Sequence, residues 1–203
     1  NALSRNVPLQ PRRPKEMDYL KQFAGMPDRI RNIVQPDFTQ TPQTEYPRRL
    51  KAVHALDTHL TPEEITVLYA FLRSPVGADT SMDPLSVNAV KNEVMDALIR
   101  QEPLPPGLGQ ELAWMAGDPS LDMGLRDYCV QHFAPCFKAR WGAGEADPES
   151  PDYQAVMLGF DQAFRSTDTS LPGTALIGLY TLSSAYKAVD RKQVEQMALQ
   201  FGG

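Results

Sequence analysis

Apolar residues recur every three or four positions along most of the chain from Arg48 onward, which is the spacing of helices buried on one face. The pattern predicts a first apolar face over residues 50–56, a helix that begins near residue 87 and ends near residue 101, and further helices over residues 62–73, 108–116, 121–140, 152–165, 171–187 and 191–201. No segment alternates apolar and polar residues over the length of a strand. The sequence therefore predicts an all-α protein.

Two prolines refine this helical pattern. Pro62 follows Thr61 and precedes Glu64, and this capping box predicts a helix that starts at residue 62. Pro135 lies inside the helix predicted over residues 121–140. Because its missing N–H removes one helical hydrogen bond, we expect a kink near Gln131.

The first 47 residues contain seven prolines and are predicted to form a separate arm. Short helices are expected over residues 15–24 and from Pro27 onward. Residues 35–47 are polar and proline-rich, and we expect an extended strap that Phe38 and Tyr46 anchor on the rest of the protein. The chain is thus divided into an arm at residues 1–47 and a helical domain at residues 48–203.

Two stretches of the helical region align without a gap. Asp83–Asn92 and Asp118–Asp127 both read Asp-Pro, five residues, a branched apolar residue, a base and then Asn or Asp, and a weaker third copy begins at Asp168. The copies are offset by 35 and 50 residues, and the loop over residues 141–151 accounts for most of the difference. The repeat unit is therefore a helix pair of about 40 to 47 residues. The helices that open near residues 87, 121 and 171 are predicted to lie side by side in one layer.

These repeated turns resemble the HEAT and armadillo-like family of paired-helix repeats over residues 48–203. That family places an acidic residue in the turn between two helices and a valine-arginine pair near the start of the second helix. Asp83 with Val90-Lys91 and Asp118 with Leu125-Arg126 are similar to those positions, with six intervening residues where the family has four. The third copy, at Asp168, lacks the base.

The resemblance implies a short right-handed α-α superhelix of about four helix pairs. It implies a structural role for Asp83, Lys91, Asp118, Arg126 and Asp168, as residues of the repeat turns that join adjacent pairs.

The function implied by the resemblance is that of a scaffold or adaptor, not an enzyme, that binds a protein or peptide on the concave face lined by the second helices. Asn88, Lys91 and Asp122 are the candidate polar contacts, and Trp141 is the candidate anchor. The alternative is a helical-repeat hydrolase or lyase with a site between the strap and the helices, in which His132 and Asp127 are the acid-base candidates.

Reactive side chains gather in one stretch, which contains Asp127, Cys129, His132 and Cys136. Cys129 and His132 share a helix face, but no glycine-rich oxyanion loop accompanies them, and a metal would need a fourth ligand from elsewhere. The two cysteines are seven residues apart, about 10.5 Å along a helix, which exceeds the reach of a disulfide. We therefore expect two reduced, buried thiols and no catalytic, cofactor-binding or metal site.

The charge of the chain limits its partners. The 203 residues carry 20 Lys and Arg against 25 Asp and Glu, a formal net charge of −5, which argues against binding to nucleic acid. The basic cluster of Arg12, Arg13 and Lys15 has no aromatic residues between its bases and is interpreted as a solvated arm. Apolar runs fall short of the about 18 residues of a membrane-spanning helix, so a soluble protein without membrane insertion is expected.

The sequence leaves two compartments open. The chain begins at Asn1 rather than Met, which suggests that an upstream segment was removed, most commonly a secretory signal, and favours an extracytoplasmic location. Two unpaired cysteines favour a reducing cytoplasm instead.

Overall fold

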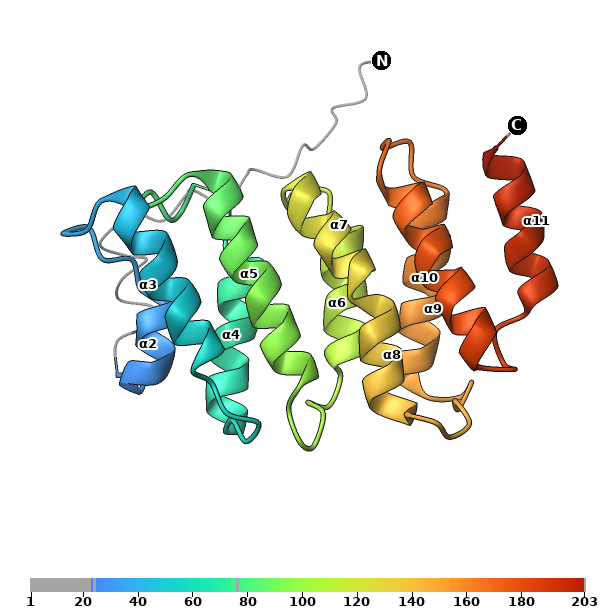
Figure 1. Cartoon of the computed structure of the whole chain (residues 1–203), viewed down its shortest axis with the longest axis horizontal. Coiled ribbons are helices and arrows are strands. Elements are labelled where there is room, and N and C mark those ends of the chain that lie inside the picture. Colours follow the sequence, from blue (N-terminus) through green and yellow to red (C-terminus); the bar gives the residue numbers. More distant parts are fainter. Residues whose placement is uncertain (1–22, 24, 76, 203) are drawn as a thin grey trace, which may run out of the picture.

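The computed structural model describes residues 23, 25–75 and 77–202, and every regular element in this part of the chain is an α-helix (Figure 1). The all-α prediction is confirmed for these residues. The helix predicted over residues 15–24 lies outside them apart from Phe23, as does the cluster of Arg12, Arg13 and Lys15. The helices are α2 (Asp28–Val34), α3 (Pro42–His54), α4 (Pro62–Arg73), α5 (Pro84–Ile99), α6 (Leu108–Gly117), α7 (Met123–Gln131), α8 (Phe133–Trp141), α9 (Pro151–Phe164), α10 (Leu171–Ala185) and α11 (Arg191–Phe201).

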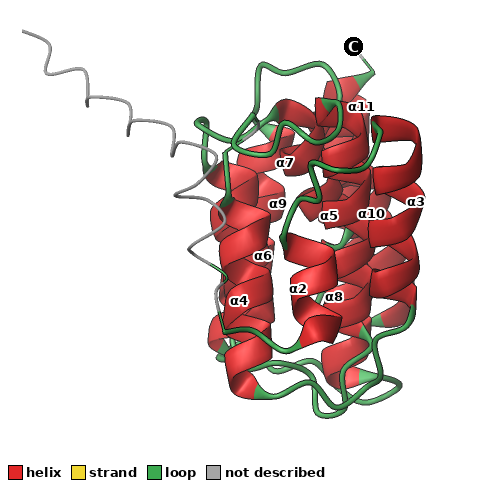
Figure 2. Ribbon diagram, turned by 90° about the vertical axis from the view of Figure 1, so that its left-hand side faces the viewer, coloured by secondary structure: helices red, strands yellow, loops and turns green. Residues whose placement is uncertain are grey.

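The helices pack in two layers, which Figure 2 shows edge-on. We call α2, α4, α6 and α9 the first-helix layer, and α3, α5, α7, α8 and α10 the second-helix layer. Each helix of the first layer packs against the helix that follows it, so the chain forms the pairs α2–α3, α4–α5, α6–α7 and α9–α10. Within the second layer α5 contacts α7 and α7 contacts α10, which confirms the predicted adjacency of the helices that open near residues 87, 121 and 171.

Local capping signals place several helix starts. The Thr61 hydroxyl accepts a hydrogen bond from the Glu64 N–H and the Glu64 carboxylate accepts one from the Thr61 N–H, so α4 begins at residue 62 as predicted. Asp83, Asp122 and Asp190 cap α5, α7 and α11 through backbone N–H groups. These side chains satisfy donors that a helix leaves unpaired at its first turn.

The extended strap predicted over residues 35–47 is wrong from Pro42 onward, because α3 begins there and continues through Pro47. Pro42 occupies the first helical position, where no backbone donor is required. Phe38 does not anchor the segment, since it is 38% exposed, whereas Tyr46 is half-buried against the core. α3 thus crosses residue 47, and the division of the chain into an arm and a helical domain stays a prediction.

The long helix predicted over residues 121–140 is broken close to the predicted kink. α7 ends at Gln131 and α8 begins at Phe133, with His132 as the residue between them. Pro135 has no N–H to donate to the Gln131 carbonyl, and this missing hydrogen bond weakens the helix at the turn where it breaks.

Two glycines bring the last helices unusually close together. A Cβ on Gly159 of α9 would lie 2.8 Å from the Phe133 ring, and a Cβ on Gly178 of α10 would lie 2.6 Å from the Phe160 ring. Phe133 and Phe160 themselves meet edge to face at 5.0 Å. Close packing of rings on glycine therefore fixes α8, α9 and α10 relative to one another.

Candidate binding surface on the second-helix layer

One contact recurs in three successive helix pairs: a base on the second helix donates to a carbonyl at the end of the first. Such carbonyls have no partner within their own helix and carry partial negative charge. The repeated contact explains why these positions need a base, and it joins the two helices of each pair. The three hydrogen bonds are Arg49 Nε to Ile33 O at 2.6 Å, Lys91 Nζ to Ser74 O at 2.7 Å and Arg126 Nε to Ala116 O at 2.9 Å.

Two of these bases also reach the next pair. Arg49 forms a buried ion pair with Asp79, in the segment between α4 and α5, and Arg126 lies 3.8 Å from Asp168, in the segment between α9 and α10. Arg126 and Asp168 therefore join adjacent pairs. Lys91 lies over the Phe71 ring at 5.6 Å, and its amine donates to Ser74 within its own pair.

Asp83 and Asp118, which align in the sequence, occupy different places in their helix pairs. Asp83 is the N-cap of α5 and bonds the N–H and hydroxyl of Ser86. Asp118 follows the end of α6 and accepts from the Ser120 N–H, while the cap of α7 is Asp122. Both hydrogen-bond locally in the described structure, so their predicted role in joining adjacent pairs is wrong.

Three of the predicted partner contacts are used inside the protein. Lys91 is fully buried, Asn88 is 3% exposed, and the Asn88 amide donates to the Asp122 carboxylate at 2.6 Å. This bond ties α5 to the start of α7. Asn88 and Lys91 are buried, and the half-buried Asp122 accepts from Asn88 and from the Gly124 N–H, so Asn88, Lys91 and Asp122 are corrected to structural residues.

Trp141 is half-buried and packs into an aromatic cluster instead of projecting as an anchor. Its ring lies 4.4 Å from the Phe137 ring and 5.9 Å from the Tyr153 ring, between centroids. The Tyr186 hydroxyl donates to the Gly142 carbonyl at 2.6 Å, just beyond Trp141. Trp141 therefore covers the core at the end of α8.

The reactive side chains of this stretch contact different parts of the protein. Cys129 and Cys136 are free and buried, as predicted, and burial raises the pKa of each thiol to about 12. His132 Nε2 lies 3.0 Å from the Asp96 carboxylate and its Nδ1 lies 2.7 Å from the Tyr128 carbonyl, so both ring nitrogens face acceptors. Among the described residues no three His, Cys, Asp or Glu side chains are placed to hold a metal ion.

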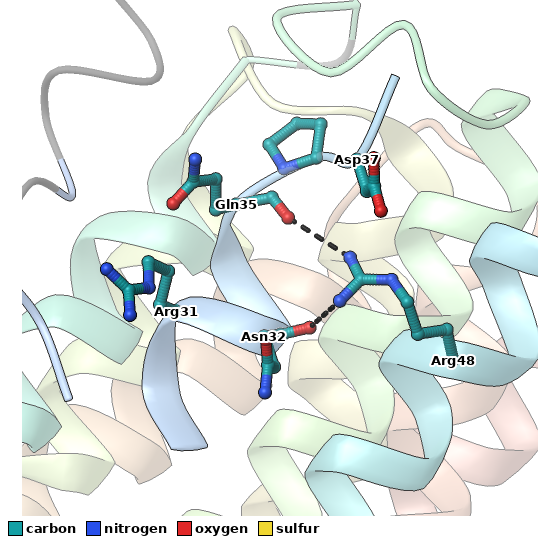
Figure 3. A pocket seen from close by; sticks show the side chains of 6 residues that line it. Arg31, Asn32, Gln35, Asp37 and Arg48 are labelled. Carbon is teal, nitrogen blue, oxygen red and sulfur yellow. Dashed lines mark hydrogen bonds between the residues drawn. The ribbon is translucent and has the colours of Figure 1, made fainter. Parts of the chain in front are cut away.

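A polar pocket of about 370 Å³ lies where the strap meets α2 and α3 (Figure 3). Arg48 dominates it and donates to the carbonyls of Asn32 and Gln35, each at 3.2 Å, and to the Glu45 carboxylate. Arg31, which also lines the pocket, pairs with Asp28. Both cations are thus paired with carboxylates of the protein, and the contacts of Arg48 hold the end of α2 on α3.

An apolar groove of about 460 Å³ lies on the second-helix layer between α8 and α10. Ile177 forms part of its wall and is 72% exposed. Lys138, which is exposed, also lines the groove and forms no hydrogen bond or ion pair through its side chain with any described residue. The lining residues are Val130, Gln131, Ala134, Pro135, Lys138, Thr174, Ile177, Gly178 and Thr181.

Sequence reasoning missed this groove, although one signal was available. The segment that forms α10 contains no charged residue, so an apolar side chain such as Ile177 has to emerge on its solvent side. The sequence does not indicate the neighbouring helix: α8 contacts α10 although α9 separates them along the chain.

Comparison of the chain with protein-family models, with curated proteins and with solved structures finds no significant match. No described helix combines the length and the apolar character that crossing a membrane requires.

Proposed function

We propose that the protein is a scaffold or adaptor that binds a peptide or protein partner on its second-helix layer. The groove between α8 and α10 is the single observation that carries the proposal, because it exposes apolar surface where a monomeric protein normally places polar side chains. Ile177, at 72% exposure, is the exposed large hydrophobic side chain of that groove.

The repeated contacts of Arg49, Lys91 and Arg126 support a stack of equivalent helix pairs. By resemblance to HEAT and armadillo-like proteins, such a stack is a right-handed α-α superhelix whose second helices line the concave face. The proposal therefore places partner binding on that layer. The partner contacts the groove, and not Asn88, Lys91 and Asp122, which form hydrogen bonds within the protein.

The alternative of a helical hydrolase or lyase has less support. The pocket beside the strap is lined by Arg31 and Arg48, which are already paired, and His132 and Asp127 lie elsewhere, on α7 and at its end. No acid-base pair faces that pocket among its described lining residues.

A photo-crosslinking residue at position 177 tests the proposal in the native cells. The matched control places the same residue at Leu158, which is 57% exposed on α9 in the first-helix layer. We expect a discrete crosslinked partner from position 177 and none from position 158. The same product from both positions, or no product from position 177, would overturn the proposal.

A further inference from the structure

His132 is a buried histidine whose ring lies between two hydrogen-bond acceptors, at the break between α7 and α8. Its side chain is only 7% exposed. Nδ1 lies 2.7 Å from the Tyr128 carbonyl, and Nε2 lies 3.0 Å from the Asp96 carboxylate. A neutral imidazole has one N–H and can donate to only one of these acceptors, whereas a protonated imidazole donates from both nitrogens. The geometry therefore favours the protonated ring in the folded protein.

Loss of one ring proton breaks the contact with Asp96 more readily than the contact with Tyr128. The Tyr128 carbonyl is fixed in the backbone of α7, so the remaining N–H stays on Nδ1. The lone pair of Nε2 then faces the negative carboxylate of Asp96, which is unfavourable. Since the Asp96 side chain is 44% exposed, it can turn into solvent. Deprotonation thus separates α5 from the break.

Two side-chain hydrogen bonds join α5 to α7 and to the break among the described residues. The Asn88 amide donates to Asp122 at the start of α7, and His132 contacts Asp96 at its end. Histidine is the side chain that ordinarily changes charge between about pH 5 and pH 8, and only the second contact contains one. The end of α7 at the break therefore responds to pH, while its start does not.

No other charged side chain pairs with the His132 ring or with Asp96 in the described part of the chain. The Cys129 and Cys136 thiols on α7 and α8 have a pKa of about 12 and stay neutral over this range. Lys138 and Arg140 are exposed on α8. The other titratable or charged side chains of the surrounding helices contact other groups, and they are Lys91, Glu93, Glu111, Arg126, Asp127, Asp152, Tyr153, Asp161 and Tyr180.

We infer that His132 is a pH-sensitive switch: its protonated ring holds α5 on the break between α7 and α8, and loss of a proton to solvent releases this end while Asn88 and Asp122 hold the other. The residues on either side of His132 line the groove between α8 and α10, namely Val130, Gln131, Ala134 and Pro135. Release of the break therefore changes the shape of the groove. This inference goes beyond the proposed function, because the switch requires no partner.

Urea denaturation of the full chain from pH 5.5 to pH 8.5 tests the switch, with Asp96→Asn as the deciding variant. An amide at position 96 can donate to a neutral Nε2, so this variant should not depend on the second ring proton. Because the folded wild type favours that proton, its stability relative to Asp96→Asn should fall as the pH rises. We expect the unfolding equilibrium constant of the wild type to rise about tenfold more over this range. Lys91 also titrates here, but both proteins contain it.

His54→Gln is the matched control. His54, on α3, contacts Glu93 of α5 at 2.9 Å, but its side chain is 54% exposed (Figure 1). Removal of this exposed pair should change the pH dependence by less than about twofold.

Hydrogen exchange of the wild type, corrected for the intrinsic effect of pH, locates the change. Amides of residues 131–136 should exchange about fivefold faster at pH 8 than at pH 6, while those of residues 123–126 should keep their rate. Asp96→Asn should show no such difference.

Three results would overturn the inference. One is the same pH dependence in the wild type and Asp96→Asn, and another is a pH dependence that His54→Gln removes and Asp96→Asn keeps. The third is exchange at the break that stays constant between pH 6 and pH 8. His132→Gln should behave like Asp96→Asn. If that buried substitution prevents folding, Asp96→Asn still decides, because residue 96 is half exposed.

Discussion

Between α3 and α5 the core of this protein contains buried charge, whereas between α8 and α10 it contains aromatic rings. In the first region Arg49 and Lys91 are completely buried beside Phe71, 5.3 and 5.6 Å from the ring centre. In the second, rings and glycines meet: Phe133 on Phe160, and Phe160 on Gly178. The same layered arrangement is therefore held by directional polar contacts at one end and by close apolar packing at the other.

The difference bears on where a partner can bind. In the first three helix pairs the bases Arg49, Lys91 and Arg126 are turned inward onto backbone carbonyls. α8, α9 and α10 are held together by rings and glycines, and Lys138, which lines the groove, forms no ion pair with a described residue. Lys138 can therefore stay beside the exposed Ile177, because the packing of α8 on its neighbours does not use this base.

The largest loss of stability is expected from a substitution in the region of buried charge between α3 and α5. Arg49→Met leaves the buried Asp79 carboxylate without its cation and the Ile33 carbonyl without its donor. We expect the free energy of unfolding, measured by urea denaturation, to fall by about 3–5 kcal/mol. Arg165→Met is the control, because the exposed Arg165–Asp161 pair should contribute less than about 0.5 kcal/mol. A loss below about 1 kcal/mol for Arg49→Met would contradict the importance of buried charge at this end.

A smaller loss of stability is expected from a substitution in the region of rings and glycines between α8 and α10. Gly178→Ala places a methyl group 2.6 Å from the Phe160 ring, and the resulting overpacking should lower the free energy of unfolding by about 1–2 kcal/mol. In the same helix, Gly173→Ala meets only Phe201, at 3.8 Å, and should be neutral or slightly stabilising.

Phe160→Leu tests whether the Phe160 ring causes the loss of stability in Gly178→Ala. If the ring causes the strain, the double variant with Gly178→Ala should be less destabilised than the sum of the two single variants. Strict additivity would show that Gly178 matters for another reason.

The sequence predicts local features of this fold well and long-range ones poorly. α4 and α11 have the predicted bounds because their starts depend on neighbouring residues, Thr61 with Glu64 and Asp190 with Lys192. The break at Pro135 is also local. By contrast, residues 42–47 were expected to be extended because they are polar and contain two prolines, although Thr41, Pro42 and Thr44 form a local start signal for α3. The burial of Arg49 against Asp79, 30 residues away, has no local signal.

The prediction of the partner-binding residues was wrong for the same physical reason. Asn88 and Lys91 look like surface groups because polar residues are usually exposed. Whether such a group is buried depends on a partner that only the fold supplies, such as Asp122, 34 residues from Asn88. Likewise, no local pattern places Lys138 beside Ile177 across two different helices.

The smallest effect at neutral pH is expected for Lys91→Met, although Lys91 is as deeply buried as Arg49. Burial lowers the pKa of Lys91 to about 8, which means that the folded protein disfavours the charged amine. Methionine removes that penalty together with the hydrogen bond to the Ser74 carbonyl, so the two changes offset each other. At pH 7 the free energy of unfolding should therefore change by no more than about 1 kcal/mol.

The pH dependence of that comparison has a definite sign. Between pH 8 and the ordinary lysine pKa of about 10.5, the unfolded chain binds more protons at Lys91 than the folded chain does, so this group makes the wild type more stable as the pH rises. The buried thiols act in the opposite direction above pH 9, because their folded pKa is raised. Since both proteins contain those thiols, subtracting the two urea-denaturation curves isolates Lys91. The wild type should gain about 3 kcal/mol on Lys91→Met between pH 7 and pH 10.5. A difference that stays constant over this range would mean that the buried amine is solvated in the folded protein, and the contrast between the charged end and the aromatic end would then rest on Arg49 and Asp79 alone.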